Sequence, residues 1–171
     1  GDGRMIIRRE RPEDAAAIGA LTAAAFEGHP YSDGSEPKII ERLRRLGQLS
    51  LSLVAEENGD IVGHVAFSPV TLTGGEAGWY GLGPVSVSPS RQRGGIGSAL
   101  INEGLTILKG EGAQGFALAG DPAYYRRFGF AAVAQLQTTG VPPEFFLVLP
   151  LHGAAPSGIV AFHPAFFGDA A

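Results

Sequence analysis

Glycines cluster where an apolar segment gives way to an amphipathic one. Residues 92–98 read Gln-Arg-Gly-Gly-Ile-Gly-Ser, after an apolar run at 79–87 and before apolar residues that recur at helical spacing. The first amides of a helix have no partner inside it and lie at the positive end of its dipole, and glycines let a bulky anion approach the backbone. Arg91 and Arg93 add charged donors. These residues predict a phosphate or diphosphate site; the alternative is a glycine-rich surface turn with solvated arginines.

The glycine spacing disfavours two common nucleotide sites. A dinucleotide-binding G-x-G-x-x-G turn starting at Gly95 would need a third glycine where Leu100 stands, and a Walker motif would need a lysine followed by serine or threonine. The sequence has neither pattern at this turn. A nucleotide-phosphate-binding domain of another kind remains an alternative, on the glycine turn alone.

Residues 120–130 hold a second group of reactive side chains. The segment reads Gly-Asp-Pro-Ala-Tyr-Tyr-Arg-Arg-Phe-Gly-Phe, with phenols at Tyr124 and Tyr125. A phenol, with an ordinary pKa of about 10, can give a proton to a leaving group. Core aromatics with satisfied hydroxyls are the alternative. Asp121, directly before a proline, is more typical of a helix N-cap than of a catalytic acid.

The composition limits the other functions open to the chain. Its 171 residues, 44% hydrophobic and 18% charged, predict one folded domain over 1–171. A net charge of −4 gives no general attraction to nucleic acid or to an anionic membrane, so neither is expected as a partner. Without cysteine, disulfides and thiolate nucleophiles are excluded, and the spacing of the four histidines predicts no metal site.

The location expected for the protein is cytoplasmic, because no apolar run has the length of a membrane span and residues 1–9 lack the apolar core of a signal peptide. Residues 1–4 precede Met5, the single methionine, and we give them no functional weight.

The elements that must position these residues follow from periodicity. We expect a strand at 5–9, two helices, and an antiparallel hairpin around Asn58-Gly59, where apolar residues alternate on both sides. A strand at 79–87, a helix at 96–109 and a strand at 115–119 predict a βαβ crossover over 79–119. The remaining elements are expected to be a helix at 122–128 and strands at 130–137, 145–151 and 158–162. The predicted fold class is α/β (α+β), with a mixed, mostly antiparallel central sheet flanked by helices.

A glycine and a proline interrupt the strand at 79–87. Leu82-Gly83-Pro84 removes a backbone donor inside an otherwise apolar strand, which is typical of a bulge or of broken pairing. The alternative is an ordinary proline on an edge strand.

Together these segments resemble a known family. The strand, the Gln92-x-x-Gly95-x-Gly97 turn and the helix are similar to the acetyl-CoA-binding motif of the GCN5-related N-acetyltransferase (GNAT) superfamily, and Tyr125-x-x-x-Gly129-Phe130 is similar to its C-terminal motif. The resemblance spans most of the chain. The short variant at 120–130 is similar to a branch of acetyltransferases with unassigned acceptors.

The resemblance implies acetyl-CoA as co-substrate and direct acetyl transfer to a primary amine in a ternary complex. It implies a strand that splays from its parallel neighbour at 82–84 and makes room for the thioester. Tyr125 is the implied general acid, the catalytic residue that protonates the departing thiolate. The implied cofactor-binding residues are Val85, Ser86, Val87, Gln92, Arg93, Gly94, Gly95, Ile96, Gly97 and Ser98.

The sequence departs from the family pattern at the general base. Many members carry a glutamate on the strand after the motif helix, where this chain has Phe116-Ala117-Leu118-Ala119. A water relay is one replacement. His64 is another candidate, against the alternative of a hydrogen-bonded strand histidine. The missing glutamate also leaves open a catalytically weak acyl-CoA-binding regulatory module.

The resemblance implies that the acceptor binds near the loop between the first two helices, and the acidity of this loop would suit a cationic amine; the alternative is a solvated charged loop. The acceptor itself, a small-molecule amine or a peptide or protein amine, is not identified by the sequence, and a homodimer is one alternative for the assembly. The residues assigned to the acceptor are Glu27, His29, Tyr31, His64 and Tyr124.

Overall fold

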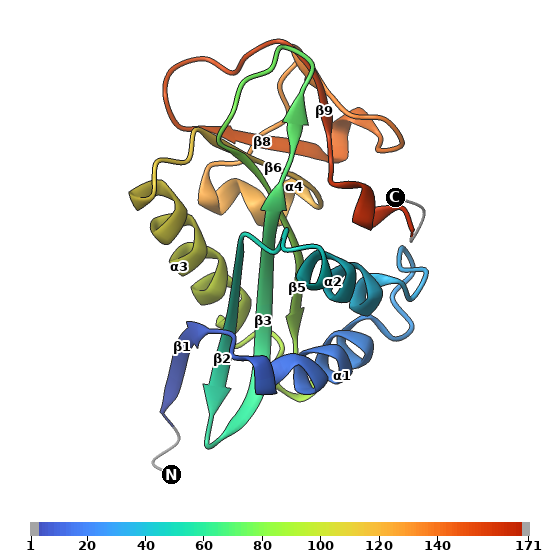
Figure 1. Cartoon of the computed structure of the whole chain (residues 1–171), viewed down its shortest axis with the longest axis vertical. Coiled ribbons are helices and arrows are strands. Elements are labelled where there is room, and N and C mark those ends of the chain that lie inside the picture. The colour runs from blue at the N-terminus through green and yellow to red at the C-terminus, as the bar shows by residue number, and fades with distance from the viewer. Residues whose placement is uncertain (1–3, 169–171) are drawn as a thin grey trace.

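The central sheet has six strands in the order β1-β2-β3-β5-β6-β8, in which β5 and β6 are parallel and the other neighbours antiparallel (Figure 1). The structure is a computed structural model that describes residues 4–168. A smaller sheet has the order β4-β9-β7. The strands are β1 (Met5–Arg9), β2 (Leu51–Glu57), β3 (Asp60–Pro69), β4 (Thr71–Leu72), β5 (Trp79–Val87), β6 (Gly115–Ala119), β7 (Leu136–Gln137), β8 (Phe146–Pro150) and β9 (Gly158–Ala161).

Helices cover both faces of the central sheet. The α-helices are α1 (Ala15–Phe26), α2 (Glu36–Arg45), α3 (Ile96–Gly110) and α4 (Pro122–Tyr125). Short 3-10 helices are η1 (Pro12–Asp14), η2 (Pro89–Arg91), η3 (Arg126–Phe128), η4 (Pro143–Phe145) and η5 (Pro164–Phe166). Leu53 packs with residues of α3, whereas its neighbour Val54 packs with Ile18 of α1 and Ile40 of α2. Because successive side chains of a strand point to opposite faces, α3 covers one face of the sheet and α1 with α2 the other (Figure 1).

The hairpin and the crossover agree with the predictions from the sequence. Asn58 and Gly59 have φ values of 53° and 86°, the left-handed pair that a two-residue turn needs between twisted strands. Chain direction then reverses from β2 into β3, and β5, α3 and β6 form the predicted parallel crossover. The fold is therefore the mixed, mostly antiparallel sheet with flanking helices that the sequence predicted.

The prediction of a strand over residues 130–137 is wrong. Only Leu136 and Gln137 pair as a strand, with β9, and Ala131 forms an isolated bridge to Val148. The apolar residues of this segment, Phe130, Val133 and Leu136, recur every third position, so they cannot line one face of a strand of period two.

The interruption at 82–84 opens the centre of the sheet. β5 and β6 pair only from Trp79 with Gly115 to Gly81 with Ala117. On its other side β5 keeps pairing with β3, with a shift in register between Val65 and Phe67. Gly83 has a φ of 127°, and Pro84 is buried in a central strand, so this is not an edge-strand proline. The open edge of β5 beyond Gly81 leads directly toward the glycine turn.

Candidate active site

The glycine turn forms an uncapped helix start. Gly95 is the N-cap of α3 with a φ of 86°, and as a glycine it has no side chain that could cap the helix. The Ala99 N–H donates to the Gly95 carbonyl at 3.0 Å, so the amides of residues 96–98 precede the first donor of the helical ladder. Ile96 is 4% exposed and can offer a ligand only its backbone. The turn thus presents the amides and the dipole end that an anion requires.

The glycine turn at residues 92–98, called the cradle from here on, has open space beside its glycines. A Cβ at Gly97 would lie 3.5 Å from the Tyr124 hydroxyl and 3.6 Å from Val87 Cγ2, which are ordinary contacts. The Ser98 hydroxyl lies 3.2 Å from the Tyr124 hydroxyl. Two hydroxyls therefore border an open backbone surface, and these residues fit a diphosphate group.

Some polar side chains of the turn bind other parts of the protein, and others are exposed to solvent. The Gln92 side-chain amide donates to the Val87 carbonyl at 3.2 Å and so ties the turn to the end of β5. Arg91 forms an ion pair with Glu57. Arg93 is exposed with a φ of 69°, and Gly94 beside it is also exposed. Of the two arginines, Arg93 is therefore better placed for an incoming anion.

The end of β5 offers backbone rather than side chains. Ser86 is 1% exposed, and its hydroxyl has no hydrogen-bond partner in the described part of the chain. Val85 and Val87 pack against the core shared with α3. Because β6 no longer pairs with residues 82–87, the edge of β5 that faces β6 is available to an extended ligand.

Tyr125 stands beside the end of β6. A Cβ at Gly120 would lie 2.6 Å from Tyr125 Cε2, so only glycine lets the ring approach this closely. The ring packs edge-on against Tyr124 and Phe130, with centroids 4.9 and 6.1 Å away. Burial raises the pKa of Tyr125 to about 12, so its phenol keeps its proton at neutral pH.

The Tyr124 side chain lies beside the glycine turn. Its hydroxyl contacts the Ser98 hydroxyl, and the Arg127 guanidinium carbon lies 4.2 Å from its ring centroid. Tyr124 is not among the residues that line the two hollows near the loop between α1 and α2, and its assignment to the acceptor stays a prediction. Asp121 caps α4, because its carboxylate accepts from the Ala123 N–H at 2.9 Å. The N-cap prediction for Asp121 is confirmed.

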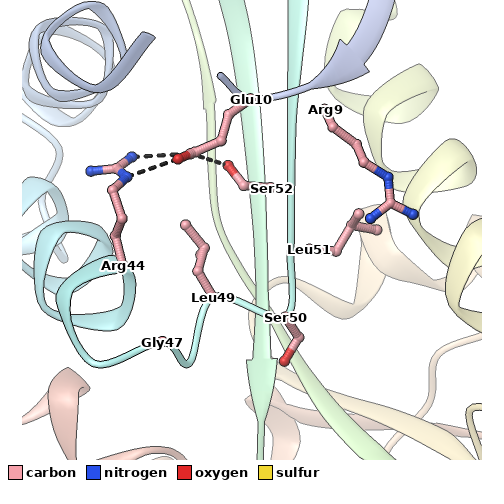
Figure 2. Close-up of a pocket in the computed structure, with 8 residues that line it drawn as sticks. All are labelled: Arg9, Glu10, Arg44, Gly47, Leu49, Ser50, Leu51 and Ser52. Atoms are coloured by element: carbon pink, nitrogen blue, oxygen red, sulfur yellow. Dashed lines mark hydrogen bonds and ion pairs between the residues drawn. The ribbon is translucent and has the colours of Figure 1, made fainter. Parts of the chain in front are cut away.

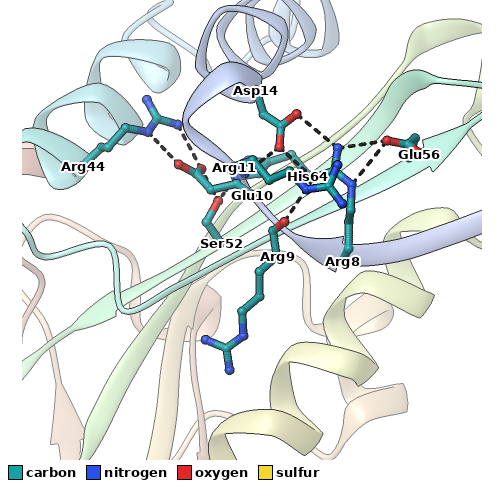
Figure 3. A network of polar contacts seen from close by, with 9 residues as sticks. All are labelled: Arg8, Arg9, Glu10, Arg11, Asp14, Arg44, Ser52, Glu56 and His64. Carbon is teal, nitrogen blue, oxygen red and sulfur yellow. Dashed lines mark hydrogen bonds and ion pairs between the residues drawn. The ribbon is translucent and has the colours of Figure 1, made fainter.

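His64 lies inside a buried polar network (Figure 3). Its Nε2 is 2.7 Å from the Ser52 hydroxyl, which donates to Glu10 at 2.5 Å, and Arg44 pairs with the same carboxylate at 2.8 Å. Since the Ser52 proton is used on Glu10, Nε2 must carry the His64 proton. Burial, together with the positive charge of Arg44, lowers the pKa of His64 to about 4, although the carboxylate of Glu10 opposes this shift. The Nδ1 atom has no hydrogen-bond partner among the described residues.

This network favours the hydrogen-bonded strand histidine over a residue that contacts the acceptor. The His64 side chain is 0% exposed and offers no surface to a substrate. A parallel set of ion pairs joins Arg8 to Asp14 at 2.7 Å and to Glu56 at 2.9 Å (Figure 3). The first set ties the end of β1 to α2, β2 and β3, and the second ties β1 to the start of α1 and to β2. We do not place His64 in the proposed site.

A cavity of about 300 Å³ lies beside this network (Figure 2). Glu10, Arg44 and Ser52 line it, with the loop that joins α2 to β2. None of the residues that line it lies at the opening between β5 and β6, so we assign it no part in the site.

The loop between α1 and α2 borders a second hollow, of about 640 Å³. Glu27 and His29 line this hollow, as the assignment of this loop to the acceptor would require. Tyr31, by contrast, is 92% exposed and is not among the lining residues. Phe26 and Glu36 line this hollow and also a third, adjoining cavity.

This third cavity, of about 330 Å³, lies where β5 and β6 separate. Gly83 and Pro84 of β5 and Ala119 of β6 form one part of its wall. The other part includes aromatic residues near the C-terminus, Phe162, Phe166 and Phe167, which the sequence analysis did not single out. No local motif marks these residues, because only the tertiary fold brings them to the opening.

Known proteins resemble this chain in sequence and in structure. A family model described as an acetyltransferase (GNAT) domain matches residues 6–133. The chain is 41% identical over 131 residues to the N-acetyltransferase YhbS of Escherichia coli K12, covering 76% of this chain and 75% of the relative.

Two solved structures share the fold. A GNAT family acetyltransferase from Brucella melitensis, in complex with acetyl-CoA, has a TM-score of 0.86 and 51% identity over 96% of this chain and 99% of that chain. YhbS from Escherichia coli, in complex with CoA, has a TM-score of 0.87 and 35% identity over 99% of this chain and 95% of that chain.

The fold, the open strand edge and the cradle define an acyltransferase, and the relatives narrow the class to the N-acetyltransferases. The chain belongs to the GNAT acetyltransferase family. Across residues 4–168, no helix combines the length and apolar character needed to cross a membrane. In the same range, His, Asp and Glu side chains form no group of three or more that could bind a metal ion.

Proposed function

We propose that this protein transfers an acetyl group directly from acetyl-CoA to a primary amine in a ternary complex. The observation that carries the proposal is the separation of β5 from β6, which leaves the edge of β5 unpaired between the glycine turn and a cavity lined by Gly83, Pro84 and Ala119. The structures that resemble this chain and contain acetyl-CoA or CoA support the choice of co-substrate.

The cradle would hold the pyrophosphate of the co-substrate. The amides of residues 94–98 supply donors at the positive end of α3, and Arg93 adds a charge. Val85, Ser86 and Val87 would supply backbone groups to the amides of the pantetheine arm along the open edge of β5. Binding along this edge places the thioester near Gly83 and Pro84.

Tyr125 would act as general acid. When the amine attacks the thioester carbonyl, the carbon–sulfur bond breaks and the sulfur leaves with an electron pair; the Tyr125 hydroxyl donates the proton that makes it a thiol. A pKa of about 12 keeps the donor protonated up to high pH. Positioning of the two reactants and backbone donors to the carbonyl oxygen would contribute to the rate together with Tyr125.

The base that takes the proton of the incoming ammonium is not supplied by β6. Phe116, Ala117 and Leu118 occupy the middle of this strand, all buried, and Ala119 ends it. The proton must therefore leave through water or through a side chain of another element.

Thiol release from acetyl-CoA over a panel of primary amines tests the proposal. We expect turnover in the wild type and a loss of about 10²- to 10⁴-fold in kcat for Tyr125→Phe, with the KM for acetyl-CoA nearly unchanged. Tyr80→Phe is the matched control, since this tyrosine lies in β5 and packs on Phe116. Full turnover by Tyr125→Phe at every pH would refute the general-acid role. Binding of acetyl-CoA without turnover of any amine would favour the regulatory module.

A further inference from the structure

We infer that the cavity at the strand opening takes a small primary amine with an apolar body, such as an arylalkylamine, and that Glu36 binds its ammonium group. This inference rests on the proposed function, because it names the acceptor class for that site. The observations behind it are the residues that line two adjoining hollows, and they are independent of the cradle and of Tyr125.

The wall of the cavity is almost wholly apolar. Beside the strand residues at the opening, Glu36 and Thr139 are the residues with polar side chains among the described residues that line it. The apolar lining residues are Phe26, Ile39, Leu82, Pro84, Ala119, Val141, Phe162, Phe166 and Phe167. An acceptor that is polar along its whole length, such as a polyamine or a sugar, would lose its hydration in this cavity without replacement hydrogen bonds.

The aromatic rings form a connected wall that is left partly uncovered. The Phe162 ring lies 5.9 Å from the Phe166 ring and 6.1 Å from the Phe146 ring, centroid to centroid. Phe166 packs on the core between α2 and the C-terminal segment, which fixes it in place. Phe167 at the rim is 75% exposed, so a bound apolar group would remove its surface from water.

Glu36 is the one charged side chain in this lining, and it stands where the two hollows meet. Its carboxylate accepts from the Ser32 hydroxyl at 2.7 Å, which holds it in one orientation. A second carboxylate, Glu27, lines the adjoining hollow beside the loop between α1 and α2. Two negative charges therefore lie next to the apolar wall, where they attract a cation.

The size of the cavity sets the size of the acceptor. About 330 Å³ is near the lower limit of the roughly 300–1,000 Å³ typical of small-molecule sites. That space suits one ring and a short aminoalkyl chain whose nitrogen lies within reach of both Glu36 and the opening between β5 and β6.

The test measures binding and turnover separately on the full chain saturated with CoA or acetyl-CoA. Calorimetry with phenethylamine, phenethyl alcohol, spermidine and a lysine-containing peptide gives affinities, and thiol release gives turnover. We expect phenethylamine to bind more tightly than the other three compounds and to be acetylated with the highest kcat/KM among the amines.

Two variants and two controls assign the contacts. Phe167→Ala should weaken phenethylamine binding about fivefold to tenfold through lost apolar contact, whereas Phe145→Ala, another exposed phenylalanine outside the cavity, should change it less than twofold. Glu36→Gln should abolish the preference for the amine over the alcohol. Glu144→Gln, outside the cavity, should keep that preference.

The outcomes separate this inference from the proposed function. Acetylation of spermidine or the peptide but not of phenethylamine would overturn the inference and leave the proposed function standing. Binding of phenethylamine that depends on Phe167 and Glu36, without thiol release, would support the inference and refute the proposed function. If each variant and its control changed phenethylamine binding equally, the assignment of the cavity as the amine site would be overturned.

Discussion

Acid should destabilise this protein through His64 before it protonates the paired carboxylates. The folded chain holds His64 neutral, with a pKa of about 4 compared with 6.5 for an unperturbed histidine. Between these values the unfolded chain binds a proton that the folded chain does not, so the free energy of unfolding falls as the pH falls. The slope is about 1.4 kcal/mol per pH unit, and the full effect is about 3 kcal/mol.

The window from pH 6.5 to 5.0 isolates this effect, worth about 2 kcal/mol. Although burial opposes it, hydrogen bonds from Arg44 and Ser52 lower the pKa of Glu10, and Arg8 lowers that of Asp14. The contributions of these carboxylates are therefore lost only at lower pH, as it falls through their own depressed pKa values. Urea unfolding followed by the fluorescence of Trp79, the single and buried tryptophan, measures the free energy at each pH.

His64→Gln is the matched variant, and its unfolding free energy should depend less on pH over the same window, by about 1 kcal/mol per pH unit on average. If this variant does not fold, the ring resonances of His64 in the wild type provide a second measurement, and they should not titrate above pH 5. Equal pH dependence of the two proteins, or titration of His64 near pH 6.5, would refute the account of the buried network.

Three further substitutions test the cradle and the core. Gly97→Val should weaken acetyl-CoA binding more than tenfold in calorimetry and leave the fold intact, because a Cβ there meets only ordinary contacts; Gly110→Val, with open space around it, should bind normally. Tyr124→Phe removes a hydroxyl from the cradle and should weaken acetyl-CoA binding about threefold. Gly104→Ala should lower the free energy of unfolding by about 1–3 kcal/mol, because its Cβ would overlap the buried ring of Phe67 and overpack the core.

The sequence predicted the parts of the fold that local chemistry determines. Asn58-Gly59 permits one tight turn, so the hairpin could be placed to the residue. The cradle could be placed because Gln92, Gly95 and Gly97 stand between a strand and a helix of clear period. The irregular pairing at Gly83-Pro84 could be predicted because proline removes a backbone donor inside an otherwise apolar strand.

The parts that could not be predicted depend on contacts distant in sequence. The bond of His64 to Ser52 joins two strands, and the sequence left a general base and a structural histidine as alternatives. Phe166 and Phe167 follow a segment with no motif, and their place in the cavity depends on packing against α2. In the small sheet, β9 corresponds to the strand predicted at 158–162, whereas β4 and β7 have two residues each, too few to produce a recognisable alternation.

The opening in the central sheet also leaves little strand pairing between the two parts of the sheet that meet at β5 and β6. Three residue pairs are the whole strand contact between the four-strand part β1-β2-β3-β5 and the two-strand part β6-β8. A co-substrate laid along the free edge of β5 would take the place of the missing strand pairing and join the two parts. At a thousand times its Kd, such a ligand adds about 4 kcal/mol to the free energy of unfolding. The co-substrate would thus complete the architecture as well as supply the acetyl group, and the resistance of the protein to unfolding would follow its occupancy.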